Sequence, residues 1–222
     1  MNIDSIPIVV VHLARAGRRA RIEGALSELG LIDNAVFVDA VDGAEIGDAD
    51  MRRHASAIGY LGHRLHRDRV TYGTLTRGAV ACALSWKSVL SGIDEPTLVL
   101  EDDAVFCDGF RHKFDTAVSR LPADWQMAYV SCNPYGIWMG PEIDSCVLRV
   151  QKRIHGTGAL LLHPQAVPLL LSLFPLDLQF DHDIPDRLIA TGRLCAYRLT
   201  YHGEALITND NFGGSFTQAA DC

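Results

Sequence analysis

The sequence predicts an α/β fold, with one domain built on a mostly parallel central sheet. Its first forty residues pass from a run rich in β-branched residues (7–13) through a segment with helical spacing (15–29) to a second such run (35–41). A strand–helix–strand succession is typical of parallel pairing, because the helix carries the chain back to the start of the sheet. The length of 222 residues suits one hydrophobic core. We therefore expect residues 1–222 to form a single domain.

Further apolar runs continue this alternation along the chain. Thr76 is a candidate N-cap for the most apolar of the predicted helices, because its hydroxyl can accept a hydrogen bond from the first turn. Strands are predicted over 96–100, 127–131, 158–162 and 195–202, and helices over 75–90, 109–121 and 164–174.

Residues 44–74 interrupt the alternation with charges, histidines and glycines that have no clear period. A connection of this length is uncommon in a compact domain unless it covers a site. We expect a partly helical excursion that acts as a mobile flap.

The charge balance limits the classes of partner. The formal net charge is −7, whereas a general nucleic-acid binder needs a basic surface to displace counterions from phosphates. We therefore expect no nucleic-acid partner. A single bound nucleotide remains compatible with this charge, because a metal ion and a few arginines can neutralise a diphosphate locally.

Cysteine spacing and hydropathy predict the compartment. The six cysteines are widely spaced and include no CxxC pair, which argues against a zinc knuckle. The start, MNIDSIPIVVVHL, lacks a basic region followed by a long apolar one, and the most apolar run (166–174) is too short to span a bilayer. We expect a soluble, cytoplasmic protein with free thiols, in at most peripheral contact with the inner face of a membrane.

Three consecutive acids, Glu101, Asp102 and Asp103, end the predicted strand 96–100. Side chains alternate along a strand, so Glu101 and Asp103 should point to one side and Asp102 to the other. Adjacent carboxylates repel one another, and a hard divalent cation relieves that repulsion. In open α/β sheets ligands bind at the carboxyl ends of strands, where these acids lie. The alternative is an acidic surface turn that closes the strand.

A second acidic group, FDHDIPD (180–186), contains the candidates for a general base, Asp181 and Asp183. A carboxylate near a metal site can take a proton from an acceptor hydroxyl within hydrogen-bond reach. The alternative is a helix start, where acids favour the positive end of the helix dipole. Both roles can coexist.

Two further candidates come from strand ends. His202 follows the last predicted strand and could complete the coordination sphere of a metal held by Asp103, or could be an ordinary surface histidine. Arg15, with Arg18 and Arg19, follows the first strand, where guanidinium groups could meet phosphate oxygens or simply face solvent. No GxGxxG, Walker A, GxSxG or HExxH motif occurs, which removes the simplest dehydrogenase, kinase, serine-hydrolase and zincin interpretations.

Four stretches, in order and over nearly the whole chain, carry a family resemblance. Together they resemble glycosyltransferase family 25, the lipooligosaccharide galactosyl- and glucosyltransferases and the related collagen galactosyltransferases. The third stretch is specific, because its EDD follows LTxG and CALS at the family's distance. The stretches are IVVVHLAR (8–15), FVDAVDG (37–43), LTRG with CALS (75–85) followed by LVLEDDA (98–104), and GTGALLL (156–162).

The resemblance implies a nucleotide-sugar-binding domain of the GT-A type, with Mn²⁺ or Mg²⁺ as cofactor. It implies inverting, metal-assisted transfer of galactose or glucose from a UDP-hexose to a hydroxyl of a glycan or lipid-linked oligosaccharide, as in lipopolysaccharide biosynthesis. Asp103 is then the first metal ligand, and Glu101 contacts the ribose or a metal-bound water. Asp102 contacts the donor sugar or anchors the loop, while Arg15 and Asp42 lie near the nucleotide. The family's P-x-D acid falls within Asp181–Asp183.

The chain also departs from the family pattern. The glutamate, the second glycine and the histidine of the family's LTxGExGCxxSH are Ala79, Ala81 and Trp86 here. Trp86 could stack on a sugar ring or fill core space. The tail, FGGS (212–215), is only loosely similar to the family's C-terminal region. These departures leave two alternatives open, a catalytically inactive nucleotide-sugar-binding module and a metal-dependent phosphohydrolase.

Overall fold

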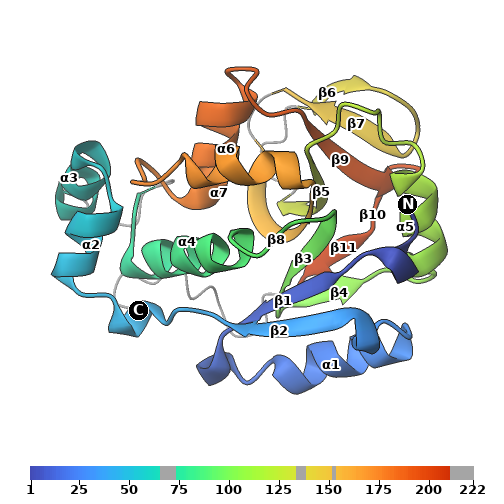
Figure 1. Ribbon diagram of the computed structural model, residues 1–222, viewed down its shortest axis with the longest axis horizontal. Coiled ribbons are helices and arrows are strands. Elements are labelled where there is room, and N and C mark those ends of the chain that lie inside the picture. Colours follow the sequence, from blue (N-terminus) through green and yellow to red (C-terminus); the bar gives the residue numbers. More distant parts are fainter. Residues whose placement is uncertain (66–73, 134–138, 152–153, 211–222) are drawn as a thin grey trace.

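A nine-stranded sheet runs through the centre of the protein (Figure 1). The structure is a computed structural model that describes residues 1–65, 74–133, 139–151 and 154–210. Eight strands follow one another across the sheet in the order β2-β1-β3-β8-β5-β9-β7-β6, and β10 pairs with β9. The strands are β1 (Ile8–His12), β2 (Ala35–Asp39), β3 (Thr97–Glu101), β5 (Met127–Asn133), β6 (Met139–Glu142), β7 (Val147–Val150), β8 (His155–Leu162), β9 (Ala196–Tyr201) and β10 (Glu204–Ala205).

The sheet is mostly parallel. β1, β2, β3, β5, β6 and β9 point in one direction, whereas β7, β8 and the short β10 run against them. β8 lies between β3 and β5 and is antiparallel to both, so its amino end lies at the edge of the sheet where β3 ends. A separate two-stranded ribbon of β4 (Ala104–Phe106) and β11 (Ile207–Asn209) extends from that edge.

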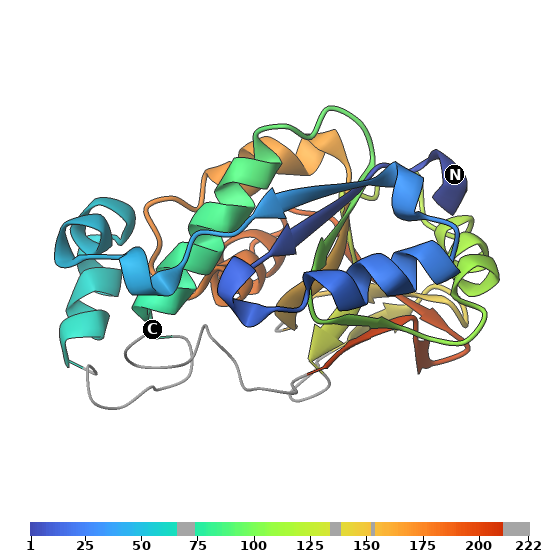
Figure 2. The ribbon, with the colours of Figure 1, turned by 90° about the horizontal axis from the view of Figure 1, so that it is seen from below.

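Helices cover both faces of the sheet (Figures 1 and 2). Strand side chains alternate between two cores: Val9 and Val99 pack toward α4, whereas Val10 and Leu98 pack toward α1 and α5. The helices are α1 (Arg19–Glu28), α2 (Asp48–His54), α3 (Ala57–Leu65), α4 (Arg77–Leu90), α5 (Phe110–Val118), α6 (Val167–Leu171) and α7 (Phe180–Asp183), which continues as a π-helical turn (Ile184–Ile189). None of the helices in the described part of the chain is both long and apolar enough to cross a membrane.

The predicted fold class is confirmed: the described residues form one α/β domain around a mostly parallel sheet, consistent with the GT-A type. Thr76 caps α4 by accepting a hydrogen bond from the Ala79 N–H at 3.0 Å. The first helix begins at Arg19 rather than Arg15, because Gly17 takes a left-handed conformation (φ 68°) after a short 3-10 turn at Ala14–Ala16. The short strands β4, β6, β7, β10 and β11 were not predicted.

The segment predicted as a flap contains α2 and α3, which stand apart at one end of the molecule in both views (Figures 1 and 2). Leu176 joins this segment to the body through two backbone hydrogen bonds, to His54 and Ser56, of 2.9 and 2.8 Å. A Cβ at Gly59 would lie 2.5 Å from the Leu176 carbonyl oxygen, so only glycine fits this contact. Residues 66–73 lie outside the described residues, and mobility of the flap stays a prediction.

Candidate active site

Glu101 ends β3 with its side chain against the start of β8. Its Oε1 accepts a hydrogen bond from the Thr157 hydroxyl at 2.7 Å. Burial and the neighbouring Asp103 charge raise the pKa of Glu101 to about 7, while the Thr157 hydrogen bond opposes the rise. A cation bound beside such a carboxyl group would stabilise its ionised form.

Asp103 is held by the chain's last described strand. Its Oδ1 accepts a hydrogen bond from Asn209 Nδ2 at 2.7 Å, and Asn209 in turn accepts one from the Ser131 hydroxyl at 2.6 Å. Burial raises the pKa of Asp103, and the Asn209 hydrogen bond and the Arg18 charge work against that rise. Asn209 therefore orients the acid that the sequence marks as the first metal ligand.

Asp102 lies with Asp103 in the turn that joins β3 to β4, and its carboxylate meets the end of β1. The Leu13 N–H donates to its Oδ2 at 2.9 Å, and Arg18 Nη1 lies 3.3 Å from its Oδ1. The carboxylate is buried, and each of its oxygens has a partner in the protein. These contacts tie the turn after β3 to the end of β1, and both roles expected for Asp102 stay predictions.

Arg15 and Asp42 lie beside one another, beyond the ends of β1 and β2. Arg15 Nε is 2.7 Å from Asp42 Oδ2, and the other oxygen of Asp42 accepts the Ala44 N–H at 2.9 Å. The two residues expected near a nucleotide thus form an ion pair at the same edge of the sheet as Glu101. Contact with a nucleotide stays a prediction.

Asp181 faces the same region from α7. Its Oδ2 accepts the Gly156 N–H at 3.1 Å, and its side chain is 24% exposed. The charge of Asp181 contributes to the raised pKa of Glu101. Burial raises the pKa of the Cys82 thiol most, and the charges of Glu101, Asp181 and Asp103 raise it further. Three carboxylates, from the end of β3, the turn after it and α7, are therefore held around the start of β8.

Asp183 faces the opposite way, into the protein, and is fully buried. Its Oδ2 accepts the backbone N–H groups of Asp177 and Leu178 at 3.0 and 3.3 Å and lies 3.3 Å from Arg187 Nη1. Burial raises the pKa of Asp183 to about 6. Of the two candidate bases, Asp181 is the one directed at the convergent carboxylates, and Asp183 holds the loop before α7.

Replacing Asp183 by alanine should lower the free energy of unfolding by about 2–4 kcal/mol, because two buried N–H donors and Arg187 lose their acceptor. Urea denaturation would measure this loss. Asp183→Asn should cost less, since its amide oxygen can still accept both N–H groups. Equal losses in the two variants would contradict the assignment of these hydrogen bonds.

The raised pKa of Asp183 also predicts how stability changes with pH. The pKa of Asp183 is about 6 in the folded chain and 3.8 in the unfolded chain. Between these two pH values the folded chain keeps the proton on Asp183 and the unfolded chain loses it. The contribution of this group to the free energy of unfolding should therefore be largest below pH 3.8 and fall as pH rises through about 6. Asp183→Asn should remove this component from the pH profile of urea midpoints.

His202 occupies the turn between β9 and β10, with a positive φ of 49°. Its ring packs edge-on against Tyr201, with 4.6 Å between ring centroids. Among the described residues, the side chains that contact the Asp103 carboxylate are Asn209 and Arg18. A role for His202 as a metal ligand stays a prediction.

Trp86 fills core space. It is 1% exposed and packs against Phe180 with 6.2 Å between ring centroids, so it offers no face to a sugar ring. Its indole Nε1 has no hydrogen-bond partner among the described residues, yet the indole lowers the pKa of Glu101 and so lies near that carboxylate. Ala79 and Ala81 are also buried in α4.

The convergent carboxylates fit a hard divalent cation. Carboxylate oxygens are the ligands that Mg²⁺ and Mn²⁺ prefer. Burial, and after it the charges of Asp103 and Asp181, raise the pKa of Glu101, and a bound divalent ion would stabilise its ionised form. Asp103 and Glu101, at a strand end, are the residues that would hold it.

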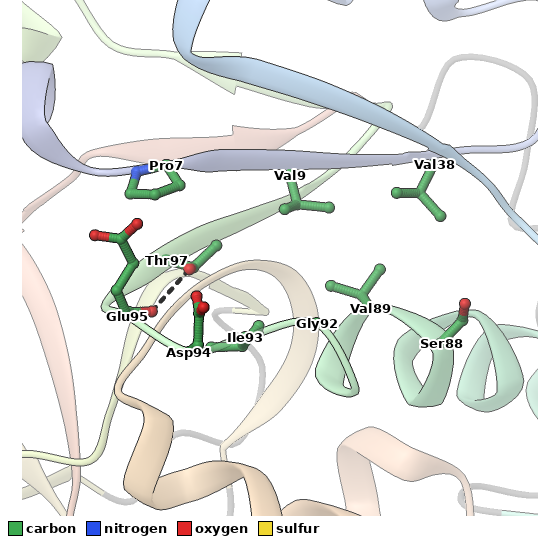
Figure 3. Close-up of a pocket in the computed structure, with 10 residues that line it drawn as sticks. All are labelled: Pro7, Val9, Val38, Ser88, Val89, Gly92, Ile93, Asp94, Glu95 and Thr97. Carbon is green, nitrogen blue, oxygen red and sulfur yellow. Dashed lines mark hydrogen bonds between the residues drawn. The ribbon is translucent and has the colours of Figure 1, made fainter.

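A pocket of about 280 Å³ lies at the opposite edge of the sheet (Figure 3). It is bounded by β1, by Val38 of β2, by the amino end of β3, by the end of α4 and by the loop between α4 and β3, and no acid of the convergent group lines it. We therefore separate this pocket from the candidate active site.

The roles of Asn209, Ser131 and Thr157 as partners of the acidic side chains could not be predicted from the sequence. Each is a single polar residue in or beside an apolar strand, and no local pattern distinguishes it from a surface residue. Gly158 is required by this contact, because a Cβ there would clash with the Asn209 amide, so glycine leaves room for the asparagine.

Comparisons with known proteins indicate one family. Residues 5–136 match the family model described as "Glycosyltransferase family 25 (LPS biosynthesis protein)". Procollagen galactosyltransferase 2 of Homo sapiens is 32% identical over 137 residues, which are 59% of this chain and 21% of that protein. Inactive glycosyltransferase 25 family member 3 of Mus musculus is 32% identical over 143 residues, 59% of this chain and 22% of that protein.

A third relative, the procollagen lysyl hydroxylase and glycosyltransferase of Acanthamoeba polyphaga mimivirus, is 28% identical over 158 residues, 64% of this chain and 17% of that protein. The chain thus spans about a fifth of the length of these relatives. The family-model match contains Glu101 and Asp103 but ends before Asp181 and Asn209.

Proposed function

The chain belongs to glycosyltransferase family 25, and on that premise we propose that it transfers a hexose from a UDP-sugar to a hydroxyl of a glycan acceptor. The observation that carries the proposal is that Asp181, Glu101 and Asp103 meet at the start of β8, where Gly156 contacts Asp181, Thr157 contacts Glu101, and Gly158 lies against the Asn209 that contacts Asp103. Ligands of open α/β sheets bind at the carboxyl ends of strands, and β8 starts at the edge where β3 ends. The name of one relative, a procollagen galactosyltransferase, supports galactose as a candidate sugar.

In this proposal Asp103, oriented by Asn209, holds Mn²⁺ or Mg²⁺, and Glu101 contacts the ribose or a metal-bound water. The cation would offset the charge that develops on the departing diphosphate. Arg15 and Asp42 lie toward the nucleotide, and Asp102 keeps the loop in place through Leu13 and Arg18.

Asp181 is the proposed general base. It accepts the proton of the acceptor hydroxyl as the acceptor oxygen bonds to the anomeric carbon, and the bond from that carbon to UDP breaks with its electron pair leaving on UDP. One displacement of this kind inverts the anomeric centre. We propose as acceptor a lipid-linked or surface glycan, reached from the cytoplasm.

Turnover tests the proposal. The full chain should release UDP from UDP-galactose or UDP-glucose in the presence of Mn²⁺ and a glycan acceptor, and release should depend on both. Thermal-shift measurements with a panel of nucleotide sugars, with and without Mn²⁺, would first identify the donor, because a ligand of the native state raises the melting temperature.

An inactive binding module is the second candidate, supported by Ala79, Ala81 and Trp86 in place of family residues and by relatives named inactive. Metal-dependent UDP binding without UDP release, across all donors and acceptors, would favour it. Absence of UDP binding with either metal would contradict both candidates.

Gly158→Ala should weaken metal-dependent UDP binding about tenfold or more, because its Cβ would displace Asn209 from Asp103 and a hydrogen bond to a charged group contributes about 1.5–3 kcal/mol. Calorimetry would measure the change. Gly24→Ala is the matched control, since a Cβ there meets nothing within 4 Å. Equal affinities in the two variants would show that Asn209 does not orient Asp103.

A further inference from the structure

A compact group of two histidines and one aspartate lies where β8 meets α7. Ligand atoms of His155, Asp181 and His182 all lie within 4.8 Å of one another. Both imidazoles are 7% exposed, and their ring centroids are 4.2 Å apart at an interplanar angle of 35°. Neither histidine has a part in the proposed transfer reaction.

The fold holds these three side chains in place. His155 is the first residue of β8, and Asp181 and His182 belong to α7. The Gly156 N–H, adjacent to His155, donates to Asp181 Oδ2 at 3.1 Å and so ties the two elements together. The other oxygen of Asp181 lies 4.0 Å from His182 Nε2. A small shift of the side chains would bring all three to one ion.

We propose that His155, Asp181 and His182 bind a borderline-soft divalent ion such as Zn²⁺, at a site distinct from the hard-cation site at Asp103. Imidazole nitrogen is a ligand that Zn²⁺, Co²⁺ and Ni²⁺ favour, whereas the Glu101 and Asp103 set offers only oxygen. Three protein ligands leave one tetrahedral position for water or another ligand. The two sites thus differ in the metals they select.

The proposal has a regulatory consequence that rests on the proposed function. A metal bound to Asp181 withdraws that carboxylate from the acceptor hydroxyl. Zinc should therefore inhibit transfer by lowering kcat, and excess Mn²⁺ should not relieve this inhibition, because the two ions occupy different ligands.

Cobalt and zinc binding test the site independently of turnover. The full chain, without an affinity tag and in excess Mg²⁺, is titrated with Co²⁺ and Zn²⁺. We expect one equivalent of Co²⁺ to produce intense visible d–d absorption, which Zn²⁺ then removes. Calorimetry should give one zinc site, weakened about 100-fold or more in His155→Gln and His182→Gln, because even outer-shell changes cost about 10- to 100-fold.

Control variants separate this site from its neighbours. His112→Gln, an exposed histidine on α5, should leave the zinc affinity unchanged, as should Asp103→Asn and Cys82→Ser. Melting temperatures of the metal-free variants identify any that fail to fold, and the cobalt spectrum of the unaltered chain needs no variant. Zinc binding that is lost in Asp103→Asn but kept in both histidine variants would overturn the proposal, as would a featureless cobalt spectrum.

A chain that binds zinc through these residues but transfers no sugar would refute the proposed function and leave the metal site standing. A chain that transfers sugar without binding zinc would refute the metal site and leave the proposed function standing.

Discussion

Replacing Asp103 by asparagine should reduce metal-dependent UDP-sugar binding by about 100-fold or more, since loss of a direct ligand should exceed the roughly 10- to 100-fold cost of an outer-shell change. Asparagine keeps the size of the side chain and its Oδ1, which can still accept the hydrogen bond from Asn209. What it removes is the negative charge that a divalent cation requires. The effect should therefore fall on metal affinity and leave folding intact.

Calorimetric titration of UDP in the presence and absence of Mn²⁺ would measure this effect. Asp108→Asn is the matched control, because Asp108 is an exposed acid five residues further along the same segment. Undiminished, metal-dependent UDP affinity in Asp103→Asn would remove Asp103 from the site. Metal-independent affinity in the unaltered chain would instead argue against any cation at the donor.

Replacing Asp181 by asparagine should lower kcat about 10²- to 10⁴-fold, the range that a positioned general base contributes. The amide oxygen can still accept the Gly156 N–H, so the position of α7 against β8 should persist. Donor affinity should remain, because Asp181 is assigned to the acceptor hydroxyl and not to the nucleotide.

Steady-state rates of UDP release in zinc-free buffer would measure the loss in kcat. Asp94→Asn, at the opposite edge of the sheet beside the pocket, is the control for loss of one negative charge. Asp183→Asn gives a second comparison, because Asp183 is held by backbone N–H groups inside the protein. A greater loss of kcat in Asp183→Asn than in Asp181→Asn would reverse the assignment of the base.

The sequence predicted those parts of the fold that have a regular pattern. Composition and hydrophobic period identify the β-branched runs at β1 and β3 and the capped helix α4. The parallel half of the sheet could therefore be predicted. β6 and β7 could not, because each has four residues and little apolar contrast with its surroundings. The direction of β8 also escaped prediction, since side-chain alternation is the same in parallel and antiparallel strands.

The candidate site was predictable only where its residues are neighbours in the chain. Glu101, Asp102 and Asp103 stand out as three acids at the end of a strand. Strand spacing could not predict their directions, because Asp102 and Asp103 lie in the turn before β4, where Arg18 Nη1 is 3.3 Å from one and 3.8 Å from the other. The partners of these acids come from sequence positions 56 to 106 residues away, and no local pattern reports such contacts. The choice between Asp181 and Asp183 likewise depends on which backbone groups each carboxylate meets, and this requires the folded chain.

The reversed direction of β8 determines where this chain can tolerate inserted residues. Because β8 is antiparallel to β3 and β5, its first residues, such as His155 and Thr157, lie at the edge of the sheet that carries Glu101. Its last residue, Leu162, lies at the opposite edge. Residues added after Leu162 would lengthen a loop remote from the carboxylates. The same addition just before His155 would enter the site itself. Under the proposed function, additions at the first end would alter the candidate site, whereas additions at the other end would affect stability alone.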